Sequence, residues 1–293
     1  MTVMLLRIHH TLRFRYDRPV FLEPMTVRLS PRQDATQQRL RHSLRVTAAP
    51  TGTAWTIEPD GNEAAVLWFS EERDNLELTV ESEVRTLREN PFDWIFTDPR
   101  AQRLPLAYAP ALAASLAPAR PDHASPTVAA WAEGLAATVD RSTTTFLIHL
   151  CDQIHASFHH IGRMDGDPQT PENTLESRTG ACRDTAMLFV AACRSQGLAA
   201  RFVSGYSIHH PPEVTEQELH AWAEVYLPGG GWRGYDPSLG LAVADGHVAL
   251  ASAPDHRLAA PVVGSYRGTG VGSTMDYTIS IGPIASPSCC PLA

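Results

Sequence analysis

Hydrophobic and polar residues alternate through most of the first 90 positions of the chain. In residues 6–16 the even-numbered positions are mostly apolar, and the odd-numbered ones carry arginine, histidine and threonine. The same alternation recurs in residues 25–29, 40–46, 55–57, 64–68 and 76–84. A period of two places successive side chains on opposite faces of a β-strand, and turn residues separate the segments. The pattern predicts a small antiparallel β-sandwich over residues 1–90.

The first of these strands has one face rich in arginine, which includes Arg7, Arg13 and Arg15. Such a face could bind an anion, but a solvent-facing sheet surface is the simpler interpretation. This part of the sequence shows no combination of residues typical of a catalytic site.

Helical periodicity replaces the alternation after an Asn-Pro pair at residues 90–91, which places a domain boundary near residue 90. The helices are predicted over residues 126–139, from a cap at Ser142 or Thr143 to about residue 158, and over residues 181–196. Gly197 follows the last helix and suits the left-handed conformation that ends many helices.

Alternating segments return after Gly197 and predict strands over residues 199–207, 220–227 and 232–236. A helix followed by antiparallel strands is an α+β order. We therefore expect a second domain over residues 91–275. The last residues, 276–293, are rich in Ser, Pro and Cys and show no clear period, which predicts a flexible tail.

The composition limits the classes of function. Hydrophobic residues make up 43% of the 293 positions and charged residues 19%, as in a globular protein with a substantial core. A net charge of −8 argues against a nucleic-acid partner. The apolar run near the start, residues 3–6, is too short for a signal-peptide core or a membrane span. We expect a soluble, cytoplasmic protein with no membrane partner.

The cysteines are Cys151, Cys182, Cys193, Cys289 and Cys290, an odd number without disulfide-framework spacing. Cys182 follows Gly180-Ala181 at the predicted start of a helix, where free backbone N–H groups and the helix dipole favour a thiolate and can stabilise an oxyanion. Cys193 lies about three turns further along and is expected in the core. Cys151 lies beside an apolar helix stripe and is expected to be a small buried hydrophobe.

A histidine and an aspartate follow on neighbouring predicted strands. His220 begins the strand over residues 220–227, and Asp236 ends the next one. Antiparallel pairing can bring Asp236 level with His220, so that the carboxylate accepts one imidazole N–H while the other nitrogen faces a thiol. Cys182, His220 and Asp236 are thus candidates for a nucleophile, a base and the group that orients the base.

Other polar residues have simpler explanations. Asp184 lies in the first turn of a helix, where an acid favours the dipole. Trp222 could line a cleft or belong to the core. Asp165 and Asp167 lack the spacing of a calcium loop. A metal hydrolase using His209, His210 and His220 is a weak alternative, because the spacing is not that of metal ligands.

Sequence blocks in the same order resemble the transglutaminase-like superfamily, in particular its bacterial branch. The blocks are GACRDTA at 180–186, GLAARFVSGY at 197–206, HAWAEVYLP at 220–228 with GW at 231–232, and YDP at 235–237. The strands containing HTLRFRYDRPV at 10–20 and VRLSPR at 27–32 resemble the β-domain that precedes the core in that branch.

This resemblance implies a papain-like, transglutaminase-like α+β core behind an amino-terminal β-sandwich. It implies Cys182 as nucleophile, His220 as base and Asp236 as orienting acid, with no metal or organic cofactor. The upstream member of an oxyanion hole has no assignable residue in this sequence.

We therefore expect attack of a thiolate on a peptide or glutamine-type amide, which leaves a thioester. Acceptance of the acyl group by water would give a cysteine peptidase or amidase, the outcome that we favour. Acceptance by an amine would give a protein-glutamine transglutaminase. A non-catalytic peptide-binding module of the same fold is a further alternative. The expected partner is a peptide or protein amide, and the oligomeric state is open.

Overall fold

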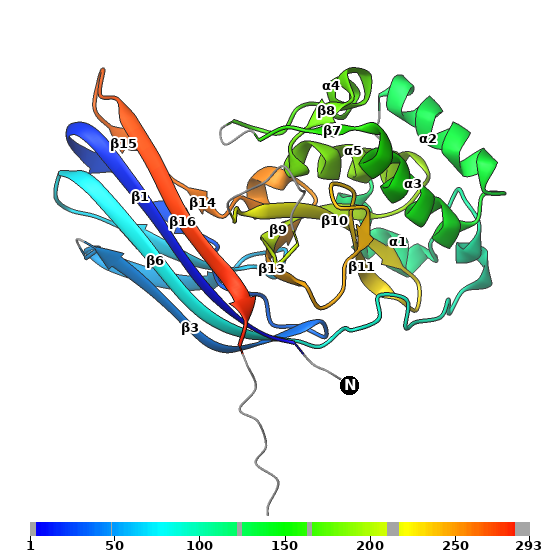
Figure 1. Ribbon diagram of the computed structural model, residues 1–293, viewed down its shortest axis with the longest axis horizontal. Coiled ribbons are helices and arrows are strands. Elements are labelled where there is room, and N and C mark those ends of the chain that lie inside the picture. Colours follow the sequence, from blue (N-terminus) through cyan, green and yellow to red (C-terminus); the bar gives the residue numbers. More distant parts are fainter. Residues whose placement is uncertain (1–3, 48, 122–124, 163–165, 210–216, 285–293) are drawn as a thin grey trace, which may run out of the picture.

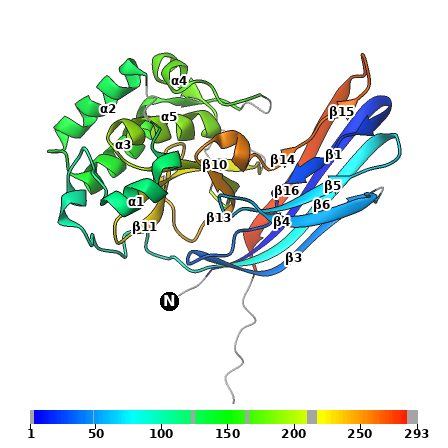
Figure 2. The same cartoon turned by 180° about the vertical axis from the view of Figure 1, so that it is seen from behind.

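The computed structural model describes residues 4–47, 49–121, 125–162, 166–209 and 217–284. Its two parts lie side by side, with a β-sandwich next to a mixed α+β core (Figure 1). The reverse view shows the same division, with the helices on the side of the core remote from the sandwich (Figure 2). Among the described residues, no helix combines the length and the apolar character needed to cross a membrane.

One sheet of the sandwich is built around its first strand and is antiparallel throughout. Its order is β15-β1-β6-β3, and β16 also pairs with β1. The strands are β1 (Leu5–Leu22), β3 (Gln37–Thr47), β6 (Arg73–Thr86), β15 (Tyr266–Arg267) and β16 (Ser273–Pro283).

The second sheet has the order β14-β2-β5-β4. Its strands are β2 (Met25–Val27), β4 (Gly52–Ile57), β5 (Glu63–Trp68) and β14 (Val262–Val263). Apolar side chains from both sheets, such as Leu6 and Leu67, pack in one core. The alternation predicted from the sequence explains this, because Leu6 and Ile8 are buried while Arg7 and His9 are exposed.

The arginine-rich face of β1 is balanced by carboxylates on its neighbours. Arg7 donates to Glu83 at 3.1 Å, and Arg13 contacts both Glu77 at 2.8 Å and Asp276 at 3.3 Å. These pairs connect β1 to β6 on one side and to β16 on the other. The charges of this face thus form cross-strand pairs at the surface rather than an unbalanced cationic patch.

The end of the described chain returns to the amino-terminal sheet. Strand β16 pairs with β1 from Tyr16–Ser273 to Leu6–Pro283. The prediction of a flexible tail is therefore wrong for residues 276–283, and β14 and β15 also join the sandwich. The apolar positions Tyr277, Ile279 and Ile281 do alternate, but the strand that they pair with lies more than 260 residues earlier. The predicted tail residues 285–293, with Cys289 and Cys290, lie outside the described residues.

The mixed core contains the predicted helices α2 (Pro126–Thr138), α3 (Thr143–Ser157) and α5 (Cys182–Ser195). Two short helices that were not predicted, α1 (Pro110–Ser115) and α4 (Pro171–Ser177), accompany them, with 3₁₀ turns η1 (Pro99–Gln102), η2 (Ala117–Ala119) and η3 (His256–Ala259). The hydroxyl of Ser142 caps α3 by accepting from Thr145 N, as the sequence predicted. Gly197 has φ of +78° just beyond α5, which is the left-handed conformation expected of a glycine after a helix.

A third antiparallel sheet, separate from the two sheets of the sandwich, forms the centre of this core in the order β12-β11-β10-β9-β13. Its strands are β9 (Ala200–Ser207), β10 (His220–Leu227), β11 (Gly231–Asp236), β12 (Leu241–Ala242) and β13 (His247–Ala253), and a short parallel pair joins β7 (His159–His160) to β8 (Thr179–Gly180). Helix α5 covers one face, where Phe189 stacks on Tyr235 at 5.6 Å between ring centroids. Tyr206 and Val248 belong to the core of the sandwich, which therefore covers the other face.

A buried ion network connects the two parts of the molecule. Arg32, in the loop after β2, donates to Glu224 of β10 at 2.7 Å, and Arg201 of β9 donates to the same carboxylate at 2.8 Å. Arg32 also donates to Ser252 of β13 at 3.0 Å. Burial acts to raise the pKa of Glu224, but Arg32 and Arg201 outweigh it and lower this pKa to about 2. The network fixes the sandwich against the sheet that carries His220.

Replacement of Ile281 by alanine tests the role of β16. Ile281 is buried in the core of the sandwich, so Ile281→Ala is expected to lower the free energy of unfolding by about 2–5 kcal/mol. Urea denaturation measures this change. Ser280→Ala, an exposed position of the same strand, is the control and is expected to change little. Equal, negligible effects of both substitutions would contradict the pairing of β16 with β1.

Replacement of Glu224 by glutamine tests the ion network. Because Glu224→Gln removes the carboxylate shared by Arg32 and Arg201 and leaves Arg32 with Asp34 alone, we expect a loss of about 3 kcal/mol at pH 7. The folded-state pKa of Glu224 is depressed, so the wild-type advantage is present above pH 4.5 and decreases as the pH falls toward about 2. Urea denaturation between pH 3 and 7 measures it. Glu77→Gln, at a surface pair, is expected to cost less than about 1 kcal/mol; a similar cost at both sites would contradict this role.

Candidate active site

The loop before α5 holds Cys182 at the first position of the helix. The carboxylate of Asp184, which is fully buried, accepts from Ala181 N at 2.8 Å and from Gln169 N at 2.8 Å. Asp184 thus has the structural role expected from the sequence. Because the first N–H groups of a helix have no partner one turn earlier, Cys182 lies at the electropositive end of α5.

Gly180 has a structural role in the loop before α5. It is buried and pairs with β7. A Cβ atom at Gly180 would lie 2.9 Å from Cβ of Asp184. The glycine is therefore required so that the capping carboxylate can pack against the backbone that precedes Cys182.

The structure brings His220 and Asp236 together with Cys182. Antiparallel pairing of β10 with β11 places Ala223 opposite Tyr235, so the end of β11 lies beside the start of β10. His220 Nε2 lies 2.5 Å from Asp236 Oδ2. The imidazole also lies close enough to the thiol of Cys182 for that group to raise the pKa of His220. Because Nε2 is engaged by the carboxylate, Nδ1 is the nitrogen left for the thiol.

The charges of this site are set by burial and by close partners. Burial alone would lower the pKa of His220, but Asp236 and Cys182 outweigh it and hold this pKa well above its usual value of 6.5. Burial alone would raise the pKa of Asp236, but His220 and His247 hold it well below its usual value. At neutral pH the site therefore contains a carboxylate beside an imidazolium.

His247 is a member of this cluster that the sequence did not indicate. It begins β13, and its Nε2 lies 3.0 Å from Asp236 Oδ2. Strand β13 pairs with β9 and lies apart from β10 and β11 in the sheet order. No spacing rule connects position 247 to position 236, and the recognised blocks end before it. Its place beside Asp236 can be recognised only from the order of the strands in the sheet.

The other described cysteines lack the position of Cys182. Cys193 is fully buried inside α5, and burial raises its pKa well above the usual value. Cys151 is also buried, and its thiol donates to the backbone carbonyl of Asp236 at 3.3 Å. It therefore supports the loop after β11 as well as filling space. Cys182, by contrast, is only partly buried.

Trp222 belongs to the core rather than to an open cleft wall, since it is 1% exposed. Its ring packs edge-on against His247 at 5.2 Å between centroids and lies 6.3 Å from His220. Gly205 makes this packing possible, because a Cβ atom there would lie 2.5 Å from the Trp222 ring. The Trp222 ring thus packs against both imidazoles, those of His220 and His247.

Among the described residues, the group with possible metal-ligand atoms close together is His220, Asp236 and His247, whose atoms lie within 4.8 Å of one another. Ligands at about 2.1 Å from a tetrahedral ion are about 3.4 Å apart, whereas the nitrogen–oxygen separations here are 2.5 and 3.0 Å. These are hydrogen-bond distances. In the alternative metal set, His209 lies near His247 with ring centroids 6.2 Å apart, and His210, like Asp165 of the calcium alternative, lies outside the described residues.

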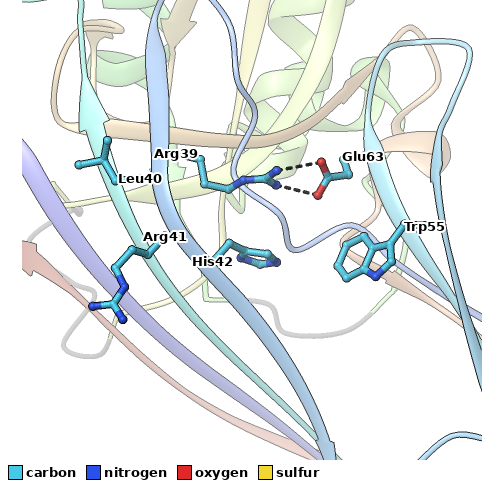
Figure 3. Close-up of a pocket in the computed structure, with 6 residues that line it drawn as sticks. All are labelled: Arg39, Leu40, Arg41, His42, Trp55 and Glu63. Atoms are coloured by element: carbon cyan, nitrogen blue, oxygen red, sulfur yellow. Dashed lines mark hydrogen bonds and ion pairs between the residues drawn. The ribbon is translucent and has the colours of Figure 1, made fainter.

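A shallow pocket of about 240 Å³ lies on the sandwich, away from the cysteine (Figure 3). Its lining residues are Arg39, Leu40, Arg41, His42, Trp55 and Glu63. The guanidinium of Arg39 is bound on two nitrogens by the carboxylate of Glu63, at 2.7 and 2.9 Å. That pairing balances the charges of Arg39 and Glu63, and the lining residues include no cysteine, serine or threonine.

Comparison with known families matches both parts of the chain. Residues 6–85 match the bacterial transglutaminase-like N-terminal region, and residues 129–237 match the transglutaminase-like superfamily. The second match contains Cys182, His220 and Asp236 but ends before His247. The chain belongs to the transglutaminase-like superfamily and carries the amino-terminal domain of its bacterial branch, as the sequence blocks indicated.

Similar proteins include an uncharacterized protein of Mycobacterium tuberculosis, which is 25% identical over 94% of this chain and 92% of its own length. An uncharacterized protein of Mycobacterium leprae is 30% identical over 39% of this chain and 41% of its own length. A solved structure from Cytophaga hutchinsonii, described as a "Putative Cysteine Protease", superimposes with a TM-score of 0.74 at 19% identity. It covers 98% of this chain and 92% of its own, and at that identity it establishes the fold.

Alkylation by iodoacetamide tests the geometry of this site. We expect Cys182 to be the cysteine that reacts, because its thiol is only partly buried and lies beside the imidazole of His220. Asp236→Asn removes the charge that holds the imidazolium and is expected to slow the reaction at pH 6 by at least about tenfold. Mass spectrometry of the peptides that contain each cysteine measures the rates.

Cys151 and Cys193 in the same samples are the internal controls, since burial raises the pKa of each thiol. They are expected to remain unlabelled while the protein is folded. Labelling of Cys193 as fast as Cys182 would contradict the assignment of Cys182 as the accessible thiol.

Proposed function

We propose that this protein is a cysteine-dependent acyl-transfer enzyme that hydrolyses peptide or protein amides. The observation that carries the proposal is the connected arrangement of Cys182, His220 and Asp236, in which a partly exposed thiol at a helix start contacts an imidazole whose far nitrogen is bound to a buried carboxylate. That arrangement suits nucleophilic catalysis, because the base lies against the nucleophile and the acid orients the base.

The chemical steps follow from the proton positions. Cys182 and His220 form a thiolate–imidazolium pair beside the carboxylate of Asp236. The sulfur attacks the amide carbon, and the backbone N–H groups at the start of α5 stabilise the oxyanion. The carbon–nitrogen bond then breaks as the imidazolium gives its Nδ1 proton to the leaving amine. The resulting thioester is attacked by water, His220 accepts the water proton, and the acid product leaves.

Hydrolysis is the outcome that we favour, and the description of the Cytophaga hutchinsonii protein as a "Putative Cysteine Protease" supports that choice. A transglutaminase would use the same steps up to the thioester and then accept a primary amine. A non-catalytic peptide-binding module would keep the fold without needing an activated thiol. The peptide or protein substrate, the cytoplasmic location and the exclusion of nucleic-acid and membrane partners stay predictions.

Incubation of a peptide library with and without a primary amine distinguishes these functions. We expect cleaved peptides in both samples, and a loss of more than about 1000-fold with Cys182→Ala, because the nucleophile is removed. Mass spectrometry of the products measures cleavage and amine incorporation together. The matched control is Cys193→Ala, another cysteine of α5, which is expected to keep activity while folded.

Amine adducts on glutamine residues that form only when Cys182 is present would indicate transglutaminase activity instead of hydrolysis. Peptide binding without products, by a protein whose Cys182 is alkylated no faster than a free thiol, would contradict an enzymatic function. Cleavage that survives Cys182→Ala would contradict the assigned nucleophile.

A further inference from the structure

One oxygen of Asp236 is shared between histidines from different strands. Oδ2 lies 2.5 Å from His220 Nε2 and 3.0 Å from His247 Nε2. The other oxygen, Oδ1, accepts from Ser238 N at 3.1 Å, Ser238 Oγ at 2.7 Å and Leu239 N at 3.2 Å. Both oxygens of this carboxylate are therefore held, and His247 supplies the contact on the oxygen that also binds the base.

The surroundings of His247 fix its ring. It lies opposite Ser207 in the pairing of β13 with β9, is 5% exposed, and packs against the edge of Trp222. The titratable groups that face it are Asp236, His220 and His209. A ring buried against a tryptophan and held by strand pairing cannot turn freely, so its Nε2 stays directed at the carboxylate.

The charge state of His247 follows from the same surroundings. Burial lowers its pKa, Asp236 acts in the opposite direction, and His220 and His209 lower it further. The ring is therefore neutral at pH 7, and Asp236 is a carboxylate that can only accept. A neutral imidazole whose Nε2 lies 3.0 Å from a carboxylate oxygen must carry its proton on Nε2 and donate it.

We propose that His247 is a positioning residue which, by donating Nε2–H to Asp236, fixes the carboxylate that orients His220. The proposal rests on the proposed function, since it concerns the same thiolate–imidazolium pair. His247 does not contact the reacting atoms; it acts through Asp236. Without it, Oδ2 keeps only its contact with His220, and the carboxylate can rotate away from its present plane and hold the His220 imidazolium less well.

The test replaces His247 by leucine and by glutamine. His247→Leu removes the donor, whereas His247→Gln retains an N–H near the position of Nε2. The readout is the second-order rate of Cys182 alkylation by iodoacetamide between pH 4 and 10, together with thermal unfolding. The matched control is His10→Leu, which removes another buried histidine, bound to Tyr206 at 2.9 Å in the core of the sandwich.

We expect His247→Leu to lower the alkylation rate at pH 7 by about tenfold, the equivalent of one hydrogen bond to a charged group. The pH above which the imidazolium is lost is expected to fall by about one unit, because a carboxylate that has turned away holds the His220 proton less strongly. His247→Gln is expected to keep most of the wild-type alkylation rate and pH profile. His10→Leu is expected to lower thermal stability without changing the pH profile.

A wild-type protein in which Cys182 reacts only as a free thiol would overturn the proposed function, and this proposal with it. An activated wild type whose pH profile is the same after His247→Leu would overturn the role of His247 alone, even if the variant unfolds at a lower temperature. If His247→Leu does not fold, ¹⁵N NMR of histidine-labelled wild-type protein decides the matter. The signal of His247 is assigned as the one that is missing from the spectrum of His247→Gln. We expect it to show a neutral ring protonated on Nε2, and a ring protonated on Nδ1 would overturn the proposal.

Discussion

A buried carboxylate is the constraint on which the site depends. Asp236 has no exposure to solvent, and an isolated charge in that position would be strongly unfavourable. It is stabilised because the loop after β11 supplies Ser238 and Leu239 to one oxygen while His220 and His247 donate to the other. The same hydrogen bonds that make the charge tolerable also orient His220 toward Cys182. A change that removed these hydrogen bonds would therefore affect both the stability of the charge and the orientation of the base.

The rest of the fold brings these donors to the carboxylate. Helix α5 presents Cys182 at its first position, β10 and β11 deliver His220 and Asp236, and β13 delivers His247 through its pairing with β9. The β-sandwich covers the face of the sheet opposite α5, and the network around Glu224 holds it there. The amino-terminal part therefore contributes to the site indirectly, by fixing the strands that carry the histidines.

Local sequence signals predicted much of this arrangement. The caps of α3 and α5 depend on residues within a few positions of the helix ends, so Ser142 and Gly197 could be assigned from neighbours in the sequence. The strands of the sandwich followed from alternation along each segment. Strand β16 was missed because its exposed, Ser/Thr-rich sequence carries a weak alternation, and its pairing with β1 depends on contacts across nearly the whole chain.

The sequence by itself indicated the longer helices, most strands of the sandwich, the family, and Cys182, His220 and Asp236 as candidate site residues. These residues lie in short blocks whose spacing reflects one helix start and two adjacent strands. The tertiary structure alone decided that His247 shares the carboxylate, that Gly180 makes room for Asp184, and that the described end of the chain completes the first sheet. These features depend on distances between segments remote in sequence. Such distances are set by sheet order and packing, which no local pattern of side chains specifies.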